Sequence, residues 1–177
     1  MNSSAKTIPK ININTLAKSA VLLSVAFFAP MVFHIQWVTG PIVNATLFLA
    51  VALVGGRNAL LIGIIPSVAA LSTGLLPAPL VPMVPFIMIS NAILITIFDW
   101  LKESGYWRGV IVAASVKFLF LYFSAAAVMN LIFREDLAIK ISQMLSWPQF
   151  FTAVLGGMIA WMILSGLNYR DDRFSKP

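Results

Sequence analysis

Six apolar runs, each close to the length that a helix needs to cross a bilayer, dominate this sequence of 177 residues. A helix spans the hydrocarbon core with about 20 residues. The runs are separated by turn-forming or polar segments, such as Gly55-Gly56-Arg57-Asn58 and the stretch from Lys102 to Arg108. We therefore predict an all-α integral membrane protein: one domain over residues 1–177, with six transmembrane helices in one bundle. The expected helices cover about residues 16–34, 38–54, 58–76, 80–98, 109–133 and 148–167.

Composition agrees with this class of protein. The chain is 60% hydrophobic and 10% charged, whereas soluble domains are about 25% charged. Lys6, Lys10 and Lys18 precede the first apolar run, as in a signal peptide, but the small-residue cleavage pattern is weak and Pro30 follows it. We expect this segment to remain as the first helix.

The distribution of Lys and Arg predicts the orientation in the membrane, because cytoplasmic loops carry the excess of positive charge. Two of these residues, Arg134 and Lys140, fall on one side, and Lys117 falls within a run. The other nine fall on the opposite side: Lys6, Lys10, Lys18, Arg57, Lys102, Arg108, Arg170, Arg173 and Lys176. Both termini should therefore be cytoplasmic, with outer loops at Ile35–Gly40, Pro77–Val81 and Arg134–Trp147.

Several functions are disfavoured by what the sequence lacks. The net charge of +6 flanks apolar runs rather than covering one polar face, which argues against nucleic acid as a partner. Without cysteine and with one histidine, the chain offers no thiolate or histidine metal site, and we expect no metal and no cofactor. It also lacks a phosphate-binding Gly-rich loop and a catalytic acid–base set. We expect no enzyme activity, and active transport would need a partner that hydrolyses ATP.

Lys117 interrupts the apolar run from Val110 to Phe133. A charge at the centre of a membrane helix costs about 2.5–3.5 kcal/mol on insertion scales. Helical spacing places Ala113, Ala114 and Leu121 on the same face, so the lysine should point into the bundle. Two interpretations stay open: its stem reaches the cytoplasmic side or pairs with Asp99, or its charge contacts an anionic substrate.

Polar side chains in and beside the other runs are candidates for a binding site. Asn44 and Asn91 lie within the second and fourth runs, where amides either join neighbouring helices or face a ligand. Near the outer end of the first run, a group of four residues either lines an outer pocket or simply forms a loop: His34, Gln36, Trp37 and Thr39.

Three segments carry a family resemblance. They are Thr39-Gly40-Pro41-Ile42-Val43-Asn44, the Gly55-Gly56-Arg57 turn, and the segment from Pro82 to Asn91. Together they resemble the substrate-binding S components of energy-coupling factor (ECF) transporters, over about Leu16 to Leu167. The resemblance is greatest to the uncharacterised branch often labelled "iron hydrogenase", although no cysteine is present to hold an iron–sulfur cluster.

The resemblance implies a six-helix protein of the bacterial plasma membrane that captures a vitamin-like micronutrient. Such proteins associate with a transmembrane T component and two cytoplasmic ATPases, and their pocket lies toward the outer side. Asn44 and Asn91 would offer hydrogen bonds, Trp37 an aromatic wall and Lys117 a charge partner. His34, Gln36 and Thr39 complete the expected binding site.

The resemblance also implies a docking surface on the first helix. The family's Ala-x-x-x-Ala motif contacts the T component, and its nearest match here is Ala20-x-x-x-Ser24. Nickel and cobalt are not expected as substrates, since Met1-Asn2-Ser3-Ser4 lacks the histidine-rich start of the metal-specific members. The alternative is a structural or assembly protein of the bacterial envelope with no small-molecule ligand.

Overall fold

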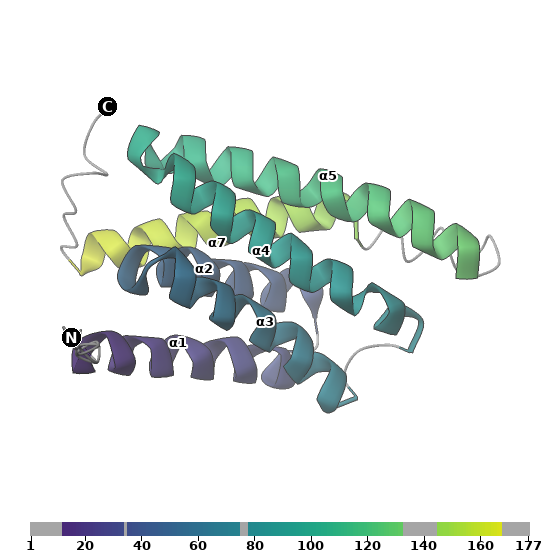
Figure 1. The fold of residues 1–177 in the computed structure, drawn as a ribbon, viewed down its shortest axis with the longest axis horizontal. Helices are drawn as coiled ribbons and strands as arrows, with labels where there is room; N and C mark the ends of the chain where they lie inside the picture. The colour runs from purple at the N-terminus through teal and green to yellow at the C-terminus, as the bar shows by residue number, and fades with distance from the viewer. Residues whose placement is uncertain (1–11, 34, 75–77, 133–144, 168–177) are drawn as a thin grey trace, which may run out of the picture.

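The computed structural model describes residues 12–33, 35–74, 78–132 and 145–167, and these residues are almost entirely helical. The described residues form six α-helices, which run back and forth along one axis (Figure 1). Two 3-10 segments, η1 and η2, adjoin α4. With the labels of Figure 1, the elements in chain order are α1 (Ile13–Val32), α2 (Gln36–Val54), α3 (Gly56–Ser72), η1 (Ala78–Met83), α4 (Val84–Leu101), η2 (Lys102–Ser104), α5 (Tyr106–Ile132) and α7 (Trp147–Gly166).

Within the described part of the chain, five spans are long and apolar enough to cross a membrane: α1, α2, η1 with α4 and η2, α5, and α7. The remaining helix, α3, has 17 residues and is about 26 Å long at 1.5 Å per residue, slightly less than the hydrocarbon thickness of about 30 Å. It packs against α1, α2 and α4. The chain is therefore a helical, multi-pass membrane protein, as its composition predicts.

The predicted helix boundaries differ from the structure by a few residues. The second helix, expected from residue 38, begins at Gln36, so most of the segment predicted as the outer loop Ile35–Gly40 belongs to α2. The predicted fourth helix begins as the 3-10 segment η1, and α-helix starts only at Val84. The reason is local: Pro82 lacks an N–H and clashes with the preceding turn, whereas Pro85 near the start of α4 is compatible with a helix.

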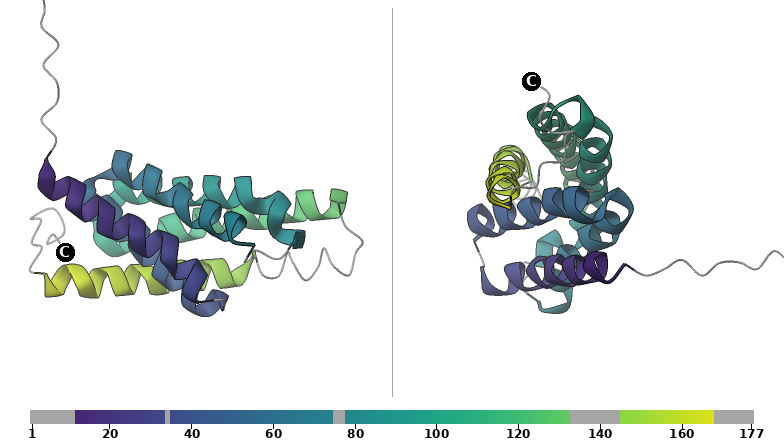
Figure 2. Two further views of the ribbon diagram at one scale, coloured as in Figure 1. Left: turned by 90° about the horizontal axis from the view of Figure 1, so that it is seen from below. Right: turned by 90° about the vertical axis from the view of Figure 1, so that its left-hand side faces the viewer.

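The centre of the bundle is α2, which contacts α1, α3, α4 and α7. Its side chains Leu47, Phe48 and Ala50 are fully buried. Figures 1 and 2 show α1 along one edge of the bundle and α5 along the opposite edge. This arrangement lets polar residues of α2 and α5 meet inside the bundle.

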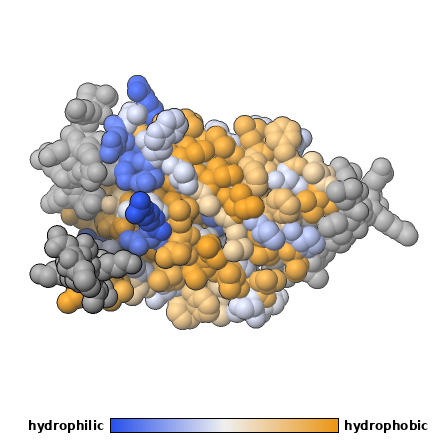
Figure 3. Space-filling model, in the orientation of Figure 1, coloured by the Kyte–Doolittle hydropathy of each residue, from blue (hydrophilic) through white to orange (hydrophobic). Residues whose placement is uncertain are grey.

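The two ends of the bundle differ in polarity. At one end, here called the polar end, α1 begins, α7 ends, and the α2–α3 and α4–α5 connections lie. Lys18, Arg57, Lys102 and Arg108 belong to these segments, and Figure 3 shows hydrophilic residues gathered there beside a broad apolar surface. The other end, here called the cavity end, holds the α1–α2 connection, η1 and the start of α7.

Candidate functional site

A cavity of about 310 Å³ lies toward the cavity end, and all six helices contribute to its wall. Most of its lining is apolar, including Pro30, Phe33, Val43 and Ile87. The polar residues among its described lining are Gln36, Thr39, Asn44, Ser67, Asn91, Lys117 and Gln149. A mostly apolar cavity with a few converging polar groups is the usual form of a small-molecule site.

Lys117 is only 3% exposed, and its position follows from the pattern of α5. Ala113, Ala114 and Leu121 on the same helical face are fully buried, which confirms the predicted inward direction. The Nζ atom donates hydrogen bonds to Asn44 Oδ1 at 2.7 Å and to Asn91 Oδ1 at 2.9 Å. We call these three residues the Lys117 cluster; it joins α5 to α2 and α4.

The orientation of the Asn91 amide is fixed by the backbone of α3. Asn91 Nδ2 donates a hydrogen bond to the carbonyl oxygen of Gly63 at 3.0 Å. The amide oxygen is then left to face the ammonium of Lys117. Gly63 also permits the close approach of the two helices, since a Cβ there would lie 2.7 Å from Ile95 Cδ1. Asn91 is thus positioned by α3 as well as by its own helix.

Asn44 is placed by a close crossing of α2 and α7. A Cβ added at Gly156 of α7 would lie 2.6 Å from Asn44 Cβ and 2.7 Å from Ala45 N. No real side chain fits at such distances without displacing the backbone, so a glycine is required here. The small residues Gly156 and Ala160, four positions apart in α7, therefore serve packing within the chain.

The cavity wall holds one hydroxyl that has no hydrogen-bond partner among the described residues. Ser67 is 6% exposed, and its Oγ atom is buried. Ser67 follows Gly63 by one turn of α3 and lines the same cavity. Since buried polar groups in folded proteins are normally paired, this hydroxyl can serve a bound ligand.

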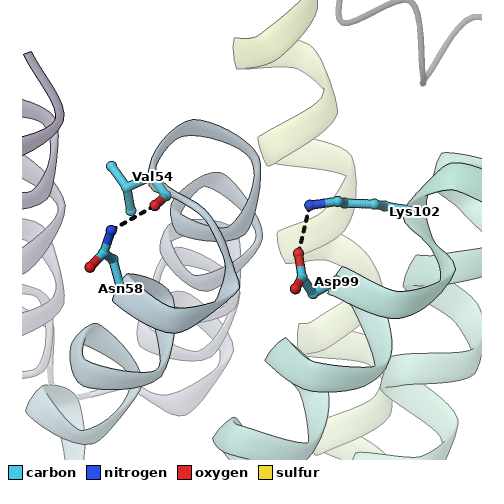
Figure 4. Close-up of polar contacts among 4 residues, drawn as sticks. All are labelled: Val54, Asn58, Asp99 and Lys102. Atoms are coloured by element: carbon cyan, nitrogen blue, oxygen red, sulfur yellow. Dashed lines mark hydrogen bonds and ion pairs between the residues drawn. The ribbon is translucent and has the colours of Figure 1, made fainter.

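The predicted alternative in which Lys117 pairs with Asp99 is wrong. Asp99 Oδ1 lies 2.6 Å from the Nζ atom of Lys102, three residues along the chain (Figure 4). The reason is distance: Asp99 is eight residues beyond Asn91 in α4, about 12 Å along the helix axis. Lys117 lies at the height of Asn91 in the bundle and therefore binds the Asn91 amide instead of Asp99. The long stem of Lys117 likewise does not extend to the surface, since the residue is buried.

The same polar end carries a second short-range contact that also stays clear of the cavity. Asn58 Nδ2 donates a hydrogen bond to the Val54 carbonyl oxygen at 2.8 Å, across the α2–α3 connection (Figure 4). These two contacts of the polar end therefore join near neighbours in the sequence, whereas the hydrogen bonds of the Lys117 cluster join different helices.

The other predicted site residues separate into three groups. Gln36 and Thr39 line the cavity, and the Thr39 hydroxyl donates to the carbonyl oxygen of Phe33. Trp37 is 55% exposed and is not part of the cavity lining. His34 lies outside the described residues. Phe33, rather than Trp37, supplies an aromatic ring to the wall.

Ser67, Phe33 and Gln149 line the cavity but were not singled out in the sequence. Ser67 is an isolated hydroxyl in an apolar run, and serines at such positions commonly bond the preceding turn of their own helix. Gln149 follows Pro148 at the start of α7, where the proline was the conspicuous residue. What these three residues share is a position toward the cavity end of the bundle. That position is known only once the helices are placed side by side.

Chemically, the described lining can bind a ligand through hydrogen bonds. Its polar side-chain groups are one ammonium, two hydroxyls and four amides. Among the described residues, no group of three His, Cys, Asp or Glu side chains could hold a metal ion. Comparisons of the chain with protein-family models, with curated proteins and with solved structures find no match.

Proposed function

We propose that this chain is the substrate-capture (S) subunit of an ECF-type importer in the bacterial plasma membrane. It binds a vitamin-like micronutrient in the cavity, and a T component and two cytoplasmic ATPases supply transport and ATP hydrolysis. The observation that carries the proposal is the buried Lys117 cluster facing a cavity of about 310 Å³. Ionisable residues at membrane depth are costly and commonly mark substrate sites.

The position of the cavity supports capture from outside the cell. Apart from Lys117, the cations in the described part of the chain are Lys18, Arg57, Lys102 and Arg108, and all four belong to segments at the polar end. By the positive-inside rule, this end faces the cytoplasm. The cavity end then faces outward, as a subunit that receives a nutrient from outside requires.

The surface of α1 supports a partner in the membrane. Ala20 and Ser24 are both exposed, and Ser24 Oγ donates to the Ala20 carbonyl oxygen at 2.9 Å, which satisfies the hydroxyl within its own helix. Two small residues four positions apart allow another helix to approach closely. We propose this face as the contact with the T component.

One observation favours the alternative function, a structural or assembly protein of the envelope. The hydrogen bonds of Lys117 connect α5 to α2 and α4, and such bonds also serve to hold helices together. The two functions differ in partners and in ligand binding, so they can be separated by experiment.

The test is purification of the tagged full chain from its native membranes in mild detergent. We expect it to bring down a membrane protein and two ATPases, and to lose them in the double variant Ala20→Leu/Ser24→Leu. Phe123→Ala is the matched control, because Phe123 is exposed on α5 at the opposite edge of the bundle. Recovery of the chain alone, or of unrelated envelope proteins, would support the structural function instead.

A further inference from the structure

We infer that the ligand of this cavity is a small organic monoanion, with one carboxylate that binds Lys117 Nζ and an apolar body that fills the remaining space. The inference rests on the proposed function, that the cavity captures a small molecule, and goes beyond it by naming the chemistry of that molecule. Three observations support it: the unbalanced charge, the direction of the hydrogen-bond donors, and the character of the wall.

Among the described residues, Lys117 forms no ion pair. The two acceptors of its Nζ atom are neutral amide oxygens, and Asp99 is bonded to Lys102. Among the described residues that line the cavity, Lys117 alone carries a full charge, and none is a carboxylate. Buried charges in proteins are normally paired with an opposite charge. A ligand carboxylate would make the site neutral overall.

The free donors in the cavity wall call for an acceptor. A lysine ammonium has three N–H donors, and two of them are used within the described part of the chain. Asn44 Oδ1 faces the ammonium, so the Nδ2 group of Asn44 points away from Lys117. This Nδ2 group donates no hydrogen bond to another described residue. The unpaired Ser67 hydroxyl lines the same cavity. A carboxylate is an acceptor-only group with two oxygens and suits such a set.

The rest of the wall limits the ligand in charge and size. A phosphate group, with nearly two negative charges at neutral pH, would meet only one cation among the described lining residues. The apolar side chains Pro30, Val43 and Ile87 offer contact to hydrocarbon. The volume of about 310 Å³ is at the small end of the usual range of about 300–1,000 Å³ for ligand sites. A compact monocarboxylate with one apolar group fits these limits.

The experiment measures binding of matched acids and amides to the purified full chain in detergent. Benzoate and hexanoate are titrated beside benzamide and hexanamide, with inorganic phosphate as the dianion, and the thermal midpoint gives an apparent Kd. Each acid should bind about 10- to 100-fold more tightly than its amide, as expected for a charge-assisted hydrogen bond. Phosphate should bind no better than the amides.

Variants then assign the effect to Lys117. Lys117→Met keeps a similar length without charge, and apolar replacement of a buried charge is usually compatible with folding. It should remove the preference for acids while leaving the amides within a few-fold of wild type. Lys102→Met, a lysine paired with Asp99 outside the cavity, is the control and should keep the preference. Glu135→Gln/Asp136→Asn should also keep it; tighter binding of acids there would show that a carboxylate of the chain already pairs with Lys117.

The inference is overturned if the amides bind as well as the acids, if Lys117→Met keeps the preference, or if none of the acids raises the thermal midpoint of the wild type. Failure of the proposed function is a separate result. In that case the T component and the ATPases would not co-purify. A chain that recruits these partners but prefers the amides would remain an S subunit, with a neutral ligand.

Discussion

At the scale of single residues, the geometry of Lys117 depends on two amides whose orientation is itself fixed. Asn91 donates to the Gly63 carbonyl oxygen and accepts from Lys117, so it is the central member of a chain of hydrogen bonds from α3 to α5. Asn91 and Lys117 are 2% and 3% exposed, and an unmade hydrogen bond in such buried surroundings is costly.

Replacing Asn91 should therefore cost stability as well as binding. In Asn91→Leu, the Gly63 carbonyl loses its side-chain donor and Lys117 loses one acceptor. We expect a loss of about 1–3 kcal/mol in the free energy of unfolding, typical of buried partners left unsatisfied. Unfolding in mixed micelles measures it. Ser115→Ala is the control, because the Ser115 hydroxyl bonds only the preceding turn of α5. Equal losses in the two variants would contradict the structure.

Asp99 provides the opposite expectation. Asp99→Asn removes its ion pair with Lys102, which is partly exposed and worth about 0–1 kcal/mol. Since Asp99 has no hydrogen bond to Lys117, uptake and ligand affinity should stay at the wild-type level. Radiolabelled uptake beside Lys117→Met measures this. A comparable loss of uptake in Asp99→Asn and in Lys117→Met would support an ion pair between Lys117 and Asp99 and would contradict the structure.

How much of the site could be predicted from the sequence differs from residue to residue. The inward direction of Lys117 followed from the small residues one turn away in α5. Its partners did not: the sequence left open a pair with Asp99 or contact with an anionic substrate, and only the relative heights of the helices bring Asn44 and Asn91 to Lys117. The role of Ser67 could not be predicted from the sequence, because it depends on the lack of a hydrogen-bond partner among the described residues.

At the scale of helices, the site depends on the crossing of α2 and α7. Gly156→Ala adds a methyl group that would lie 2.6 Å from Asn44 Cβ and 2.9 Å from the Pro41 carbonyl oxygen. We expect the two helices to separate, with a loss of about 1–3 kcal/mol in stability from overpacking and weaker ligand binding as Asn44 shifts.

Gly166→Ala in the same helix is the matched control, because a Cβ there meets nothing within 4 Å. Thermal unfolding and ligand titration should show the wild-type midpoint and affinity for this control. If Gly156→Ala matched Gly166→Ala in both measurements, the close α2–α7 crossing would be incorrect.

Helix boundaries were predicted best where the local signals were strong. The α2–α3 turn at Gly55, whose φ of 86° favours glycine, lies where the Gly-Gly-Arg-Asn segment predicts it. The α1–α2 connection lies about two residues earlier than predicted, because α1 ends at Val32 and α2 begins at Gln36, inside the segment predicted as the outer loop Ile35–Gly40. Polarity alone does not distinguish a loop from a helix whose polar residues face a cavity.

At the scale of the whole molecule, the orientation in the membrane decides whether the cavity opens outward. The absence of cysteine makes this testable, since any introduced cysteine is the only one in the chain. Ile35→Cys, at the cavity end, should react with a membrane-impermeant maleimide on intact cells. Glu103→Cys, at the polar end, should react only after permeabilisation, and the unmodified chain is the unlabelled control. The reverse pattern would place the cavity on the cytoplasmic side and contradict uptake from outside.

We propose that the Lys117 cluster binds a captured nutrient, and mass spectrometry of the small molecules that the chain retains after purification from native membranes measures this. We expect one anionic compound in near-stoichiometric amount with wild type and with Lys102→Met, and its loss in Lys117→Met. If the two variants and the wild type retain the same molecules in the same amounts, or retain none, then the cluster only holds helices together.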